Sequence, residues 1–211
     1  MTQKMERVPG KPHKVLLLSG LGDNKDVWGF NKILEHDNWK NSGFETQAIN
    51  MDWMNPDETF EQKLERLTAV IDELYEDFVV SIIGASAGGS MAFNLLIARL
   101  ERVSKAISVC SRLRKGHHFW RSFDRMTDKS PSFAKSVVTF EKQEPDIPQN
   151  VRDRMMTWSA KFDELVPLET SQLEGATNVD IPSIEHMFTM YISLTKFSQI
   201  IIDFIADVDA T

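Results

Sequence analysis

The chain has 211 residues, so we expect residues 1–211 to form one domain. Hydrophobic residues make up 42% of the sequence and charged residues 26%, which excludes a disordered or fibrous chain. The net charge of −7 disfavours a broad nucleic-acid surface, and we expect no nucleic-acid partner. Cys110 is the one cysteine, so neither an internal disulfide nor a cysteine-rich zinc site is possible.

The N-terminal region lacks a long apolar stretch. Residues 1–14 are polar and charged, and the apolar run that follows, residues 15–18, is too short for a signal peptide or a membrane span. We therefore expect a cytoplasmic protein with no membrane span. Having one cysteine fits a reducing compartment, and the oligomeric state is left open.

Short, continuous apolar runs predict strands that are buried on both faces of a parallel sheet. The clearest of these runs are residues 15–18, 78–83 and 106–110. Weaker strand patterns occur at residues 44–51, 155–159 and 179–181.

Helical patterns separate these runs. Apolar residues recur at three- and four-residue spacing over residues 60–74, and the opposite, outer face is expected to carry Glu61, Lys63, Glu65 and Arg66. Residues 91–100 predict a buried helix, and residues 187–204 predict one long C-terminal helix. Alternating strands and helices favour an α/β fold with a doubly wound, mostly parallel sheet.

Residues 112–150 interrupt the alternation. This segment carries a net charge of +3 while the rest of the chain carries −10, and it is rich in aromatic residues. We interpret it as a helical lid or cap insert over a site, with a helical excursion around its own small core as the alternative. Its aromatic residues favour an apolar acyl pocket, whereas its excess of basic residues favours a substrate that carries a carboxylate or phosphate. The substrate-binding candidates here are Phe119, Trp120 and Phe123.

The sharpest motif is Gly84-Ala85-Ser86-Ala87-Gly88, which matches G-x-S-x-G. It follows a predicted buried strand and precedes a predicted buried helix, which is the setting that a nucleophilic serine on a tight turn needs. Small flanking residues are required there because larger side chains would collide in the turn. The motif predicts that Ser86 is a nucleophile, and the alternative is a glycine-rich helix start packed on the sheet.

A second glycine motif, Ser19-Gly20-Leu21-Gly22, follows the first predicted strand. In a serine hydrolase this loop supplies one backbone N–H of the oxyanion hole, and the residue after the nucleophile supplies the other. That assigns the Leu21 and Ala87 amides, with Gly20 and Gly22 bordering the substrate. A dinucleotide fingerprint is excluded because Lys25 stands at its third glycine position.

The order of the remaining candidates completes a triad. Hydrolases with this elbow place the acid and then the histidine after the serine. Asp163 and His186 both follow weaker predicted strands, and the rival acids are Glu164 and Asp180. The other histidines lie before the acid, so they do not fit this order; they are His13, His36, His117 and His118.

These motifs resemble those of the α/β-hydrolase superfamily, and in particular a small esterase- or lipase-like serine hydrolase. The resemblance extends from Val15 to about Ala206. It rests on residues 18–22, Trp28, Asp52, the elbow at Ser86, Asp163-x-x-Val166-Pro167 and Ile181-Pro182-x-x-x-His186. Family members usually have histidine where this chain has Ser19, and often where it has Ala85. Because the family's first antiparallel strands have no counterpart before Val15, the sheet should have about six strands.

The resemblance implies a serine hydrolase that cleaves a carboxylic ester or related acyl bond through a Ser86–His186–Asp163 triad and an acyl-enzyme. Its partner would be a small-molecule ester or acyl substrate, with no cofactor and no metal. An acyl-thioesterase or lysophospholipase would use the same site, and a non-catalytic hydrolase-like binding protein is the remaining alternative. Dehalogenases and epoxide hydrolases of this fold need an aspartate where Ser86 stands.

Overall fold

The computed structural model describes residues 10–22, 27–116, 123, 128–183 and 185–207. Six strands form one sheet in the order β2-β1-β3-β4-β5-β6, and every neighbouring pair is parallel. The strands are β1 (His13–Leu18), β2 (Glu45–Ile49), β3 (Val79–Ala85), β4 (Val103–Val109), β5 (Met155–Ala160) and β6 (Thr177–Ile181). The predicted α/β class, with a parallel sheet of about six strands, is therefore confirmed.

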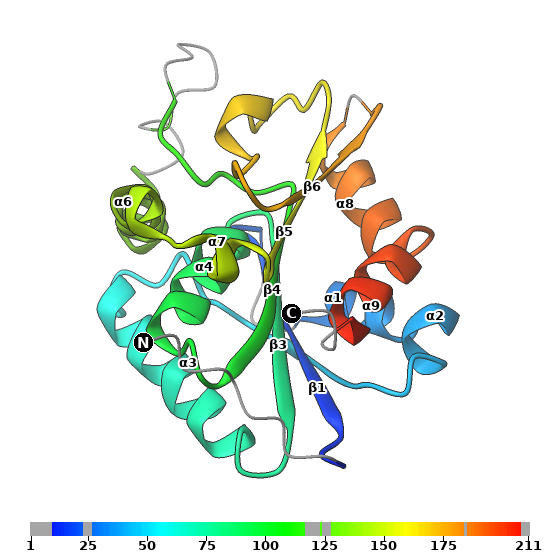
Figure 1. Ribbon diagram of the computed structural model, residues 1–211. Coiled ribbons are helices and arrows are strands. Elements are labelled where there is room, and N and C mark those ends of the chain that lie inside the picture. Colours follow the sequence, from blue (N-terminus) through cyan, green and yellow to red (C-terminus); the bar gives the residue numbers. More distant parts are fainter. Residues whose placement is uncertain (1–9, 23–26, 117–122, 124–127, 184, 208–211) are drawn as a thin grey trace.

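Helices cover both faces of the sheet (Figure 1). On one face lie α3 (Phe60–Leu74), α4 (Gly88–Ala98) and α6 (Pro131–Gln143). The other face is covered by α1 (Trp28–Leu34), α2 (Asp37–Lys40), α8 (His186–Leu194) and α9 (Ser198–Ala206). Shorter segments are η1 (Glu144–Asp146), α7 (Gln149–Arg152) and η2 (Leu168–Thr170). No helix in the described part of the chain has the length and apolar character needed to cross a bilayer.

The continuous apolar runs reflect burial on both faces. In β1, Leu16 and Leu18 belong to the core beneath α3, α4 and α6, whereas Val15 and Leu17 belong to the core beneath the helices of the other face. All four side chains are at most 1% exposed. Successive strand residues point to opposite faces, so a strand between two helical layers needs apolar residues at every position.

The predicted C-terminal helix is wrong in one respect, because it is two helices. The chain leaves helical geometry at Thr195, between α8 and α9. There the carbonyl of Leu194 accepts a hydrogen bond from Trp39 Nε1 at 2.7 Å, and that of Thr195 accepts one from Asn38 Nδ2 at 3.2 Å. Side chains of α2 thus satisfy carbonyls that a continuous helix would use itself.

The later part of the predicted insert is a core element. Helix α6 packs on α4, where Ser136 Oγ bonds Ser90 Oγ at 2.8 Å and the Phe140 ring lies 5.3 Å from that of Phe93. Residues 131–143 therefore belong to the helical layer on that face. Of the predicted aromatic contacts, Phe119 and Trp120 lie outside the described residues. Phe123 is 8% exposed and packs in the same core.

Cys110 directly follows β4 in left-handed backbone geometry, with φ at 51°. Its side chain is 1% exposed. Burial, together with the nearby Asp163 carboxylate, raises the pKa of the Cys110 thiol well above its ordinary range. The thiol is thus a small buried apolar group at neutral pH.

Candidate active site

Ser86 occupies the sharp turn between β3 and α4, with φ at 51°. A positive φ is costly for a residue with a side chain, so the surroundings must impose it. The flanking glycines permit the turn by letting backbone segments approach closely. A Cβ built on Gly84 would lie 2.2 Å from the Gly88 carbonyl oxygen, and one on Gly88 would lie 2.7 Å from the Leu18 carbonyl oxygen.

We expect Gly84→Ala to lower the free energy of unfolding by about 1–3 kcal/mol, because the added methyl meets backbone that cannot move aside. Gly29→Ala is the matched control: a Cβ there has no neighbour within 4 Å, and alanine in a helix should raise stability by about 0.4–1 kcal/mol. Urea denaturation of both variants measures the difference. Equal effects would show that the turn tolerates a side chain.

His186 connects the two other triad candidates. It is the first residue of α8, and its Nε2 lies 3.0 Å from Ser86 Oγ. Its Nδ1 lies 2.7 Å from Asp163 Oδ2. The side chains of His186 and Asp163 are each 2% exposed, so their contact is shielded from water. Residues far apart in the sequence thus meet at the carboxyl edge of the sheet.

The turn after β5 fixes the Asp163 carboxylate. Its Oδ1 accepts hydrogen bonds from the Leu165 and Val166 amides at 2.7 and 2.8 Å. Because Oδ1 is occupied by two backbone donors, Oδ2 is directed at His186. Both carboxylate oxygens therefore have assigned partners, and the charge is stabilised without exposure to solvent.

The rival acids have other partners. Glu164 Oε2 accepts a hydrogen bond from the backbone N–H of His186 at 2.8 Å, so Glu164 holds the start of α8. Asp180 accepts two bonds from Gln172 Nε2, both at 3.0 Å and both exposed. The contact of Glu164 was missed in the sequence analysis, although the unpaired N–H groups at the start of any helix call for acceptors.

The loop after β1 passes directly over the nucleophile. A Cβ built on Gly20 would lie 3.0 Å from Ser86 Cβ, so only glycine fits this approach without displacement. Gly22, in the segment that follows β1, is exposed. Within the described residues, neither the Leu21 nor the Ala87 amide donates a hydrogen bond. An oxyanion hole requires backbone N–H groups that are not already bonded within the protein, and among the described residues these two amides meet that condition.

Other polar residues singled out in the sequence have structural contacts. His13 Nε2 bonds Ser81 Oγ at 2.9 Å, and His36 directly precedes α2. His117 and His118 lie outside the described residues. Across the described ranges, no group of three or more His, Cys, Asp or Glu side chains could hold a metal ion.

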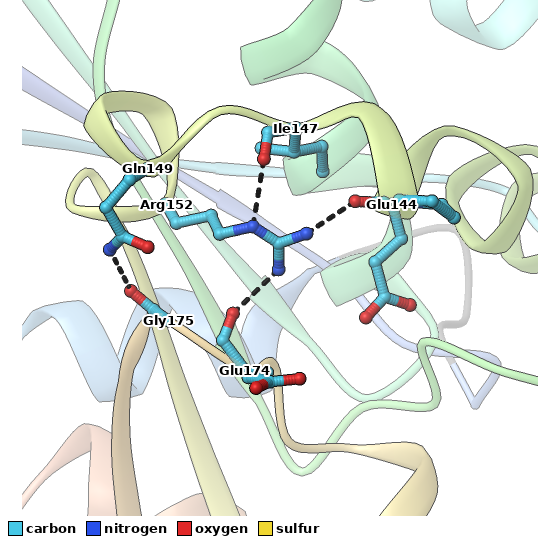
Figure 2. A pocket seen from close by; sticks show the side chains of 7 residues that line it. Glu144, Ile147, Gln149, Arg152, Glu174 and Gly175 are labelled. Atoms are coloured by element: carbon cyan, nitrogen blue, oxygen red, sulfur yellow. Dashed lines mark hydrogen bonds between the residues drawn. The ribbon is translucent and has the colours of Figure 1, made fainter.

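A surface hollow of about 760 Å³ lies before β5 and β6, at the amino edge of the sheet. Arg152 is one of the residues that line it, and Figure 2 shows its side chain donating to the backbone carbonyls of Glu144, Ile147 and Glu174, at 2.6–3.0 Å. Gln149 likewise bonds the carbonyl of Gly175 at 2.7 Å. These side chains tie neighbouring loops together, so the hollow is a structural junction remote from Ser86.

No protein-family model matches the chain, and no curated protein sequence is similar to it. Solved structures do resemble it. Est1E from Butyrivibrio proteoclasticus is 19% identical, with a TM-score of 0.65 over 96% of this chain and 90% of that one. The monoacylglycerol lipase of Paleococcus ferrophilus is 14% identical, with a TM-score of 0.60 over 95% of this chain and 97% of that one.

A thermophilic esterase from Thermogutta terrifontis is also similar, at 14% identity and a TM-score of 0.60 over 94% of this chain and 91% of that one. Structural similarity at such low sequence identity shows the fold and not the reaction. The chain therefore has the α/β-hydrolase fold, as its motifs indicate. Because this fold hosts many reactions, the chemistry has to be argued from the site.

Proposed function

We propose that the protein is a serine hydrolase that cleaves a carboxylic ester or a related acyl bond. The observation that carries the proposal is the hydrogen-bonded series from Ser86 Oγ through His186 to Asp163, with distances of 3.0 and 2.7 Å. These are the contacts that a general base and its orienting acid require. Similarity to an esterase and a monoacylglycerol lipase supports the same class.

The geometry supports a two-step acyl transfer. His186 Nε2 takes the Ser86 proton as Oγ attacks the carbonyl carbon, and the Leu21 and Ala87 amides receive the negative charge on the carbonyl oxygen. The intermediate collapses, and the leaving alcohol takes the proton from His186. Water, activated by His186, then attacks the acyl-enzyme; this releases the acid and restores the Ser86 hydroxyl. Asp163 stabilises the imidazolium in both steps.

Two other functions are compatible with the same observations. An acyl-thioesterase or a lysophospholipase would need the same three side chains and differ only in the leaving group. A binding protein that has lost turnover would keep the fold without an activated serine. Neither the ester nor the thioester reaction requires a cofactor, because the nucleophile and base are both side chains of this chain.

A fluorophosphonate probe tests the proposal. We expect one equivalent of adduct on Ser86, detected by intact-protein mass spectrometry, since an activated serine is needed to displace fluoride. His186→Ala removes the base and should slow labelling by at least about 10²-fold. Absence of labelling in the wild type would favour the binding protein.

For an active enzyme, hydrolysis rates on p-nitrophenyl esters of increasing acyl chain length would define the acyl pocket. A sharp preference for the acetate ester would exclude a deep pocket.

A further inference from the structure

The segment after β2, residues 51–53, is hydrogen-bonded to the start of the glycine loop that follows β1. Trp53 Nε1 donates to the Ser19 carbonyl oxygen at 3.0 Å. The Met51 amide donates to Ser19 Oγ at 3.0 Å, and the Ser19 amide donates to the Ile49 carbonyl at 3.1 Å. Because Ser19, Met51 and Trp53 are all 0% exposed, these bonds do not compete with water.

Lys63 holds this segment from the other side. Its ammonium donates to the carbonyls of Met51 and Asp52 at 3.0 and 2.8 Å, and to Glu58 Oε2 at 2.7 Å. The Lys63 side chain is 0% exposed, so the expectation that it lies on the outer face of its helix is wrong. A buried ammonium is stable only with such partners, and here all three of its protons can be bonded.

The charge on Glu58 is itself supported. Burial alone would raise the pKa of the Glu58 carboxyl, but hydrogen bonds from Arg66 and Lys63 outweigh it and hold that pKa below its ordinary value. The Lys63 ammonium therefore faces a carboxylate at neutral pH. This pair fixes Lys63 against the two carbonyls, one of which belongs to Asp52 in left-handed geometry, with φ at 45°.

Fixing Ser19 removes most of the backbone freedom between the sheet and the proposed oxyanion donor. The Ser19 carbonyl is part of the peptide plane that it shares with Gly20, and only the φ and ψ of Gly20 separate this plane from the Leu21 N–H. Glycine is the residue least able to restrict those angles, yet a side chain at Gly20 would meet Ser86 Cβ at 3.0 Å. The stiffness that an oxyanion hole requires must therefore come from neighbouring elements.

We propose that Trp53 and Lys63 are positioning residues that hold the Leu21 amide in the oxyanion hole, acting through Ser19. This inference rests on the proposed hydrolase function. It predicts that loss of the Trp53 hydrogen bond weakens binding of the tetrahedral intermediate more than binding of the ester itself.

Trp53→Phe tests this inference, because it removes the indole N–H but keeps an aromatic ring beside Phe133, whose ring centroid lies 5.8 Å from that of Trp53. Trp39→Phe is the matched control: Trp39 is 1% exposed and also donates to a carbonyl, that of Leu194, but on the opposite face of the sheet. Each variant is assayed for kcat and KM on p-nitrophenyl butyrate. The inhibition constant of an alkyl trifluoromethyl ketone, which forms an oxyanion on the serine, is measured in parallel.

For Trp53→Phe we expect kcat to fall by about 10- to 100-fold, somewhat less than the loss of a whole oxyanion donor. KM should stay within about twofold, and the trifluoromethyl ketone should bind more weakly by the same factor as kcat falls, as expected for a transition-state analogue. Trp39→Phe should leave kcat, KM and the affinity for the trifluoromethyl ketone unchanged. If Trp53→Phe fails to fold, Ser19→Ala takes its place, since it removes the acceptor of the Met51 amide.

A Trp53→Phe enzyme whose kcat and inhibitor affinity match those of Trp39→Phe would overturn this inference and leave the hydrolase proposal intact. Equal loss of stability in both variants, without the parallel loss of inhibitor binding, would show that Trp53 serves only packing. A wild-type protein that neither hydrolyses esters nor reacts with the fluorophosphonate would overturn both proposals together.

Discussion

Ser86→Ala is expected to reduce kcat for ester hydrolysis by roughly 10⁵- to 10⁶-fold, because no other group in the triad can form the acyl-enzyme. The fold should be unaffected, because alanine keeps the Cβ of serine and lacks only the hydroxyl oxygen. That oxygen is hydrogen-bonded to His186, within the site. Initial rates on p-nitrophenyl butyrate give the kinetic effect, and circular dichroism with a thermal melt verifies the fold.

Ser90→Ala provides the control for that variant. Ser90 is a fully buried serine about one turn further along, in α4, and its Oγ bonds Ser136 Oγ at 2.8 Å. Its loss should cost about 1 kcal/mol of stability and leave the rate within about twofold. Wild-type turnover by Ser86→Ala would end the serine hydrolase proposal, whereas equal losses in both variants would indicate damage to packing.

The strands and the elbow were predictable because their determinants are local. A buried parallel strand needs apolar residues at consecutive positions, so the apolar runs at residues 15–18 and 78–83 predict strands directly. The turn at Ser86 needs small residues on both sides, and Gly84 and Gly88 stand there. The order of serine, acid and histidine along the chain then selects residues at one sheet edge, where the structure brings Asp163 and His186 together.

Contacts between distant elements could not be predicted in this way. Glu164 resembles any exposed carboxylate beside Asp163, and only the approach of α8 gives it the His186 amide as a partner. The break at Thr195 likewise depends on Asn38, which lies 157 residues away in the sequence. Helical periodicity alone does not reveal a hydrogen-bond acceptor or donor that another element supplies.

Lys63 shows the same limit more sharply. Lysine is almost never fully buried without a partner, so its position among Glu61, Glu65 and Arg66 predicts a solvated face. Its burial is possible because the segment after β2 presents two backbone carbonyls at that place. A residue of this kind is recognised only when the fold is known, which is why the network around Ser19 came from the structure.

Asp163→Asn should lower kcat by about 10⁴-fold through a change of tautomer. The Leu165 and Val166 amides both donate to Oδ1, so the asparagine oxygen must occupy that position. Its NH₂ group then replaces Oδ2 and donates to His186 Nδ1. The imidazole proton is forced onto Nε2, which becomes a donor toward Ser86 and can no longer accept its proton.

Asp180→Asn is the control, because Asp180 is the rival acid, and within the described part of the chain its exposed carboxylate bonds only Gln172. It should keep kcat within about twofold, as is usual for surface substitutions. If Asp163→Asn retained a tenth or more of the wild-type kcat, the acid would have to be another group, and Glu164 is the nearest alternative. A large loss with unchanged thermal stability would assign the tautomer-setting role to Asp163, because the two turn hydrogen bonds survive the substitution.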